Sequence, residues 1–266
     1  MGFFDIHAHL TSPKLAADEV QILQRAKDAG VTTIVSNGLN PLDNEAVAAL
    51  AGRSALVQPA FGLYPVDAVL PEMEAMGIDY PRDAQFETEE AIQWIEDHVE
   101  DCVAIGEIGL DHYWVPEELW ELQERIFRRL VRLALAADKP IIIHTRKAER
   151  RAFEILQELG ATRVNWHCYS AKVKLGRQIA AHGHWLSIPA NVRRAENFTR
   201  LLETLPREKI LLETDCPYLG PVRGELNEPM NVLGTARFAA ERWGSSIEGV
   251  QHQLEENFEA LMGFAP

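Results

Sequence analysis

The segment Phe3-Phe4-Asp5-Ile6-His7-Ala8-His9-Leu10 places two histidines one residue apart between apolar and aromatic flanks. In a strand, alternate side chains leave the same face, whereas a helix would turn these imidazoles to roughly opposite sides. The flanks and the polar turn at Thr11-Ser12-Pro13 favour a strand that ends just after His9. Two imidazoles facing one point make half of a metal site. A lone His-x-His is more often structural, so the rest of the chain must supply the partners.

Short apolar runs alternate with amphipathic segments along the whole chain, which is the pattern of βα units around a parallel sheet. Eight strands are predicted, over residues 3–10, 32–37, 56–63, 103–110, 140–145, 163–169, 185–189 and 209–215. The chain has 266 residues, and a closed (β/α)8 barrel needs about 250. No linker, low-complexity block or repeat divides it. We therefore predict an α/β fold, a (β/α)8 TIM barrel, as a single domain over residues 1–266.

The clearest helical pattern runs from Pro116 to Ala137, where apolar residues recur at intervals of three and four. A C-terminal amphipathic helix is predicted from Ser245 to Phe264 and should pack on the barrel. The segment from Asp67 to Glu90 is long, acidic and interrupted by prolines. It is either a lid over one end of the barrel or a surface excursion, and its sequence favours neither.

Charge and cysteine content limit the class of protein. The 40 acidic and 26 basic residues give a formal net charge of -14, which argues against general electrostatic coating of nucleic acid but leaves local basic patches open. Three cysteines and the lack of a charged-then-apolar leader favour a reduced, cytoplasmic setting. No apolar run approaches the roughly 18 residues of a membrane span, so we expect no membrane contact.

Metal-binding residue types recur at the carboxyl ends of the predicted strands, where barrel active sites lie. Singly, each has a structural explanation, such as a helix N-cap for Asp215 or a core position for His167. Six are expected to converge on one mouth: His7, His9, Glu107, His144, His167 and Asp215. So many buried polar groups would be costly without a metal. Nitrogen and oxygen ligands without sulfur suit Zn, Mn or Mg.

Alternation along the strands also assigns neighbouring residues. If His167 and Asp215 point inward, Cys168 and Cys216 point outward, and neither thiol is expected to be a ligand.

The same parity turns Asp5, Asn165 and Glu213 inward, one layer beneath the ligands. We expect some of them to fix the imidazole tautomers, and the alternative is a polar core layer that holds water. The motif His182-Gly183-His184 ends a helical pattern, which places it at the opposite rim. We interpret this second His-x-His as structural.

Five sequence segments contain the six candidate ligands: Asp5–Leu10, Gly106–Asp111, Ile143–Arg146, His167–Ser170 and Glu213–Leu219. In combination they resemble the signature segments of TatD-type metal-dependent deoxyribonucleases, a branch of the amidohydrolase superfamily. The resemblance extends from the first predicted strand to the last. It implies a (β/α)8 barrel that hydrolyses phosphodiester bonds, in several members by 3'-5' exonucleolytic removal of nucleotides from DNA.

The resemblance also implies two divalent metal cations, Mg, Mn or Zn. By it, one ion would be held by His7, His9, Glu107 and Asp215, and the other by Glu107, His144 and His167, with Glu107 as the bridge. Two positions depart from the family pattern. Tyr64 stands where a histidine is usual, and Ala171 stands where a glycine commonly follows the serine. Neither is an expected ligand.

Two ions about 3.5 to 4 Å apart can share a water and lower its pKa. Asp215 is then expected to be a ligand and the proton acceptor for that water, beside the catalytic bridge Glu107. Arg146 shares the parity of His144 and should face the site, where its guanidinium could clamp a substrate phosphate. Four aromatic residues could stack nucleobases or simply pack the rim: Tyr113, Trp114, Tyr169 and Tyr218.

Two other functions stay open at this stage. The same metals could polarise a carbonyl, so that the enzyme would hydrolyse a C–N, ester or lactone bond. That chemistry often bridges its ions with a carboxylated lysine, and Glu107 in the bridging position favours the nuclease-like branch. A non-catalytic, metal-dependent binding protein is the alternative from another class, which the full set of ligand types disfavours. The expected partner is DNA or another phosphoester.

Overall fold

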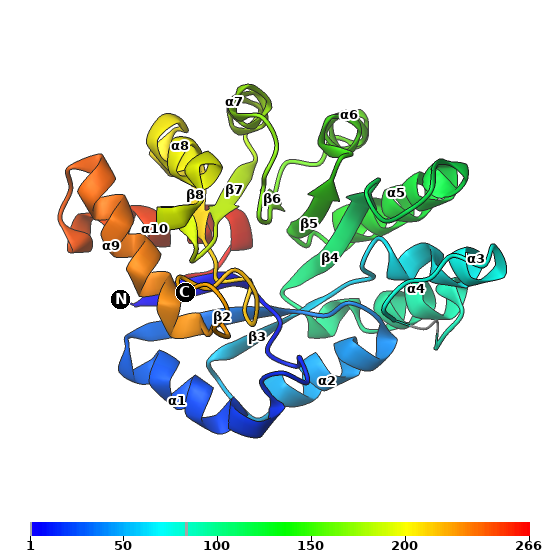
Figure 1. The fold of residues 1–266 in the computed structure, drawn as a ribbon, viewed down its shortest axis with the longest axis horizontal. Helices are drawn as coiled ribbons and strands as arrows, with labels where there is room; N and C mark the ends of the chain where they lie inside the picture. Colours follow the sequence, from blue (N-terminus) through cyan, green and yellow to red (C-terminus); the bar gives the residue numbers. More distant parts are fainter. Residues whose placement is uncertain (1, 83–84) are drawn as a thin grey trace.

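The computed structural model describes residues 2–82 and 85–266, in which eight strands form one parallel sheet in chain order (Figure 1). The strands are β1 (Phe3–Ala8), β2 (Val31–Asn37), β3 (Val57–Phe61), β4 (Ala104–Asp111), β5 (Ile141–Arg146), β6 (Val164–Trp166), β7 (Trp185–Ile188) and β8 (Ile210–Leu212). Two backbone hydrogen bonds close the ring. His9 N–H donates to the Cys216 carbonyl (2.8 Å), and Asp215 N–H donates to the His7 carbonyl (2.9 Å).

Helices surround this sheet, as Figure 1 shows, so the fold is the predicted (β/α)8 TIM barrel. The helices of the described residues are α1 (Glu19–Asp28), α2 (Pro41–Ala51), α3 (Leu70–Ala75), α4 (Thr88–Asp97), α5 (Trp120–Ala136), α6 (Glu149–Leu159), α7 (Val173–His182), α8 (Glu196–Thr204), α9 (Val232–Trp243) and α10 (Ile247–Met262). Strands covered by helices outside and by side chains inside are buried on both faces. Every residue of β4 is buried accordingly.

The predicted C-terminal helix is α10, and it covers the amino-terminal end of the barrel. The Ser246 side chain caps it by accepting a hydrogen bond from Gly249 N–H. Phe258 packs against Phe4 at the start of β1, with 4.6 Å between ring centroids. Asn257 donates a hydrogen bond to the Ile210 carbonyl at the start of β8 (2.7 Å). This helix therefore lies at the end opposite the predicted mouth.

Two predicted strands end three residues too late, and the other strand ends differ by at most two residues. β6 ends at Trp166 rather than Tyr169, and β8 ends at Leu212 rather than Asp215. The chain leaves the extended conformation because φ is +44° at Cys168 and +56° at Asp215, values that lie in the left-handed region. Strand parity therefore cannot assign the cysteine side chains, although the metal-binding groups found among the described residues contain no thiol.

The segment after β3 lies over the carboxyl end of the barrel. It contains a short 3-10 helix at Asp67–Val69 and then α3. Tyr80, Pro81 and Arg82 line the pocket at the barrel mouth together with Glu107. Residues 83–84 of the predicted segment lie outside the described residues. The described parts, residues 67–82 and 85–90, support a cover over one end of the barrel.

His184 is buried beneath the barrel wall and is structural, as predicted. Trp166 Nε1–H donates to its Nδ1 (3.1 Å), so the proton sits on Nε2, which donates to the Ala161 carbonyl (2.8 Å). Burial lowers the pKa of His184 to about 4. Among all described residues, no helix has both the length and the apolar character needed to cross a bilayer.

Candidate metal centre

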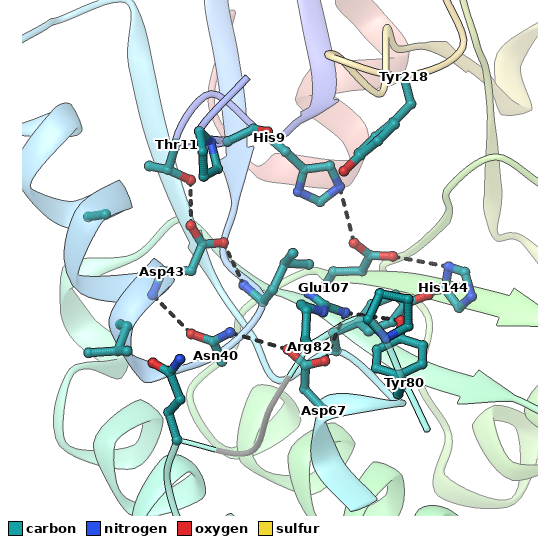
Figure 2. Close-up of a pocket in the computed structure, with 18 of the residues that line it drawn as sticks. His9, Thr11, Asn40, Asp43, Asp67, Tyr80, Arg82, Glu107, His144 and Tyr218 are labelled. Carbon is teal, nitrogen blue, oxygen red and sulfur yellow. Dashed lines mark hydrogen bonds and ion pairs between the residues drawn. The ribbon is translucent and has the colours of Figure 1, made fainter. Parts of the chain in front are cut away.

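Glu107 is a buried residue of β4, and its two oxygens face two different groups of side chains. Oε2 lies 3.5 Å from His7 Nε2 and 3.4 Å from His9 Nε2. Oε1 lies 3.1 Å from His144 Nδ1 and 3.6 Å from His167 Nε2. Figure 2 shows the carboxylate between the His9 and His144 rings. One carboxylate thus joins β1 on one side to β5 and the segment after β6 on the other.

Asp215 completes the first of these groups. Its Oδ1 lies 3.4 Å from His9 Nε2 and 3.9 Å from His7 Nε2. The backbone hydrogen bond from Asp215 N–H to His7 fixes this approach across the closure of the barrel. The structure therefore brings together all six residues that the sequence assigned to one mouth. Among the described residues, two of the groups that could hold a metal share Glu107, and a third consists of His7, His167 and Asp215.

In three of the imidazoles, the ring nitrogen that points away from Glu107 contacts an oxygen atom. His9 Nδ1 lies 3.1 Å from the Asn37 carbonyl, His144 Nε2 lies 3.0 Å from Asp111 Oδ2, and His167 Nδ1 lies 3.3 Å from Glu213 Oε2. These acceptors require the proton on the outer nitrogen, so the nitrogen that faces Glu107 carries the lone pair. This is the tautomer that a metal ligand needs.

The residues fit metal cations. The Nε2 atoms of His7 and His9 lie 3.2 Å apart, and both face ionised carboxylates. Lone pairs and negative charges that point at one another in a buried site are costly unless positive charge lies between them. Nitrogen and oxygen donors without sulfur suit Zn, Mn or Mg.

The site keeps its carboxylates ionised. Burial opposes ionisation of Glu107, but His167, His144 and His7 outweigh it and hold the pKa of Glu107 well below its usual range. Burial also opposes ionisation of Asp215, yet the neighbouring imidazoles of His9, His167 and His7 lower its pKa. Both groups are therefore in the form that binds a cation.

Of the three residues expected one layer beneath the ligands, Glu213 is the one that contacts an imidazole. Asp5 instead accepts hydrogen bonds from the backbone N–H groups of His7 (3.3 Å) and Thr214 (2.9 Å), so it ties β1 to the segment after β8. Asn165 donates to the Ser187 hydroxyl (3.0 Å). The prediction that some of the three fix imidazole tautomers is therefore met by Glu213, while Asp5 and Asn165 contact backbone N–H groups and a hydroxyl instead.

Asp111 is a functional position that the sequence reasoning missed. It ends β4, four residues after Glu107, and its carboxylate reaches the far nitrogen of His144. Its shared parity with Glu107 was a usable signal. The contact of His9 with the Asn37 backbone carbonyl could not be predicted from the sequence, because every residue has a backbone carbonyl.

Arg146 does not line the pocket that holds His144. It is exposed, lines a neighbouring pocket, and its guanidinium lies 3.6 Å from the centroid of the Tyr113 ring. The inward orientation predicted from parity is wrong because β5 ends at Arg146 and the long side chain gains a cation–π contact by leaning outward. A contact between Arg146 and a substrate phosphate stays a prediction.

The aromatic residues divide into buried and exposed positions. Tyr169 is fully buried, and its hydroxyl donates to the Lys172 carbonyl (2.9 Å). It therefore packs the rim and cannot stack a base. Tyr113, Trp114 and Tyr218 are 52%, 40% and 48% exposed.

The pocket above the candidate metal ligands has a volume of about 870 Å³. The departure Tyr64 lies in its wall, with its ring centroid 4.9 Å from that of His144. Arg82 lies over the Tyr64 ring. It also forms an ion pair with Asp67 (2.8 Å), and Figure 2 shows these two side chains together. The other departure, Ala171, lines the neighbouring pocket.

Comparison with known proteins gives concordant results. The family model described as "TatD related DNase" matches residues 4–263. Deoxyribonuclease TATDN3 of Homo sapiens is 31% identical over 97% of this chain and 93% of its own length. The 3'-5' ssDNA/RNA exonuclease TatD of Escherichia coli is 30% identical over 98% and 99%. The crystal structure of YJJV, a TatD homolog from Escherichia coli, shares the fold with a TM-score of 0.84, at 23% identity over 98% of both chains.

Proposed function

The chain belongs to the TatD-related DNase family of metal-dependent hydrolases, and from this premise we propose that it hydrolyses phosphodiester bonds of single-stranded nucleic acid at a centre of two divalent cations. The 3'-5' direction of cleavage is proposed by analogy with the exonuclease of Escherichia coli. The substrate class is DNA or RNA.

The observation that supports two cations is the division of Glu107 between two groups of side chains. One cation would be held by His7, His9, Asp215 and Glu107 Oε2, and the other by His144, His167 and Glu107 Oε1. When bound, such cations lower the pKa of a water and neutralise charge on phosphate oxygens. Mg, Mn and Zn all suit these donors.

The chain's own residues hold the reacting groups and move the proton. Asp215 is ionised, lines the pocket and faces both first-strand imidazoles, so it can orient the attacking water and accept its proton. Glu107 keeps the two groups of ligands at a fixed separation. Tyr64 and Arg82 form part of the pocket wall beside these groups.

Hydrolysis of a C–N, ester or lactone bond is the second candidate at the same centre. The carboxylate bridge favours phosphodiesters, as does the fact that no lysine is among the described residues that line the pocket. A non-catalytic binding protein is not retained, because the family consists of hydrolases.

The three thiols are free, which supports a reducing compartment such as the cytoplasm. We also propose that residues 1–266 act as one domain.

The test is metal depletion followed by resupply. Protein stripped with a chelator and given Mg, Mn or Zn should release nucleotides from end-labelled single-stranded DNA, while a panel of amides and lactones stays intact. Labelling each end separately gives the direction of cleavage. Turnover of an amide or lactone without nucleotide release would support the second candidate instead.

A further inference from the structure

A second pocket of about 650 Å³ adjoins the metal-ligand pocket. Both pockets draw lining residues from the carboxyl end of β5 and from the segment that follows β6. His144 lines the first pocket and Arg146, two residues further on, lines the second. In the same way His167 lines the first and Ser170 lines the second. A ligand that leaves the metal centre on this side therefore meets the second pocket next.

The second pocket is strongly basic in a chain of formal charge -14. Six cationic and two anionic side chains line it. We use the name basic cleft for five of the cations: Arg146, Lys147, Arg150, Lys172 and Lys174. Within residues 2–82 and 85–266 no carboxylate forms an ion pair with any of these five, whereas the sixth, Arg151, is held by Glu124 (2.6 Å). Arg150 donates a hydrogen bond to the neutral Gln178 side chain (2.9 Å), which leaves its charge uncompensated. Cations without a carboxylate partner that gather in a hollow indicate an anionic ligand.

Two helices begin at this cleft and add to its positive potential. α6 starts after Ala148 and α7 after Lys172, and neither first turn has a side-chain cap. Their free N–H groups and helix dipoles favour a negative charge at the same place as the five cations. Figure 1 shows the two helices side by side on the barrel.

A row of aromatic rings connects the two pockets. Tyr80, which lines the first pocket, lies 5.5 Å from Trp114 between ring centroids, and Trp114 lies 5.2 Å from Tyr113. Arg146 of the basic cleft then lies over Tyr113. Tyr113 and Trp114 are 52% and 40% exposed, so the ring surface that Arg146 and Tyr80 leave uncovered is open to a ligand. Aromatic side chains beside a cationic groove are the usual platform for single-stranded nucleic acid.

We propose that the basic cleft binds the phosphates of a single-stranded polynucleotide whose cleaved phosphodiester lies at the metal centre, with its bases stacked on Trp114 and Tyr113. This inference rests on the proposed function and adds that the substrate is a polymer several nucleotides long. Cations on the backbone and rings on the bases act on every sequence alike. Selectivity for chain length, rather than for base sequence, follows.

The test compares two substrates with the metal-loaded enzyme: an oligothymidylate single strand and the small diester bis(p-nitrophenyl) phosphate. For the double variant Lys172→Gln/Lys174→Gln, we expect kcat/KM on the oligonucleotide to fall about tenfold relative to kcat/KM on the small diester. The salt dependence of oligonucleotide KM should become shallower by about one unit of slope per lost phosphate contact. Trp114→Ala should lower the same ratio, and Trp114→Phe should restore it.

Lys27 is the matched control, because it is an exposed lysine at the end of α1, on the far rim. Lys27→Gln should leave the ratio and the salt slope as in the wild type. Equal ratios and slopes in Lys172→Gln/Lys174→Gln and the wild type would overturn the proposal. Fluorescence anisotropy of labelled oligonucleotide measures its affinity without turnover. A wild type that cleaves neither diester would refute the proposed function. The affinity measurement then still tests the basic cleft: weaker oligonucleotide binding by the double variant would support the cleft, and binding equal to that of the wild type would refute it.

Discussion

Asp111 Oδ2 lies 3.0 Å from Nε2 of His144, on the opposite side of the ring from Glu107. This contact fixes the tautomer that directs the Nδ1 lone pair into the site. We predict that Asp111→Asn lowers metal affinity about 10- to 100-fold, because outer partners of ligating histidines orient them and raise their basicity. Calorimetric titration of the metal-free protein measures the change. Asp97→Asn, at an exposed position on α4, is the control, and equal affinities for both variants would remove Asp111 from the metal centre.

Asp215 has two roles in the proposed reaction. Asp215→Asn should weaken metal binding by the group that contains His7 and His9, and saturating metal should not restore turnover. We predict a residual kcat roughly a hundredfold or more below the wild type, which is the usual size of a lost proton acceptor. The measurement is kcat for the small diester as a function of metal concentration. Recovery of full kcat at high metal would show that Asp215 acts as a ligand alone.

Gly62 follows β3 and packs directly on the backbone of Glu107. A Cβ at this position would overlap Glu107 N and O and Gly106 C, which are backbone atoms that cannot move aside cheaply. We predict that Gly62→Ala costs about 1–3 kcal/mol in the free energy of unfolding and also lowers metal affinity by moving the bridge. Gly234→Ala in α9 has open space around its new methyl group and should be neutral or slightly stabilising. Urea denaturation with and without metal compares the two, and a neutral Gly62→Ala would contradict the packing argument.

His184 should make stability depend on pH. Its pKa is about 4 in the folded protein, against 6.5 ordinarily, so the unfolded chain binds the proton more tightly. The stability that neutral His184 provides is therefore complete above pH 6.5 and is lost as the pH falls toward 4, by roughly 3 kcal/mol. His184→Gln should be less stable than the wild type at neutral pH, and the difference should shrink as the pH falls. A constant difference in unfolding free energy across that range would refute this assignment.

Much of the fold could be predicted from the sequence because the barrel strands are short apolar runs separated by amphipathic helices. The metal ligands could be assigned to one mouth because carboxyl ends of parallel strands meet there. The exact strand ends could not. His167 and Asp215 lie in turns beyond β6 and β8, and the backbone conformations at Cys168 and Asp215 depend on tertiary contacts such as the bond from Asp215 N–H to His7.

The orientation of side chains at the barrel rim also could not be predicted from the sequence. Parity predicted that Arg146 faces inward, but a long side chain at the last residue of a strand follows its best contact, which is Tyr113. Asp5 shares the parity of His7, yet it contacts backbone N–H groups because the segment after β8 passes beside it. Parity gives the face of a strand, and the partner on that face is set by packing.

The central claim is that Glu107 joins two cation sites, one at each of its oxygens. Anomalous scattering from crystals soaked with Mn or Zn tests it most directly. Two peaks are predicted about 3.5 to 4 Å apart, one between Oε2 and the imidazoles of His7 and His9, the other between Oε1 and the imidazoles of His144 and His167. A single peak, or none, at saturating metal would contradict the account.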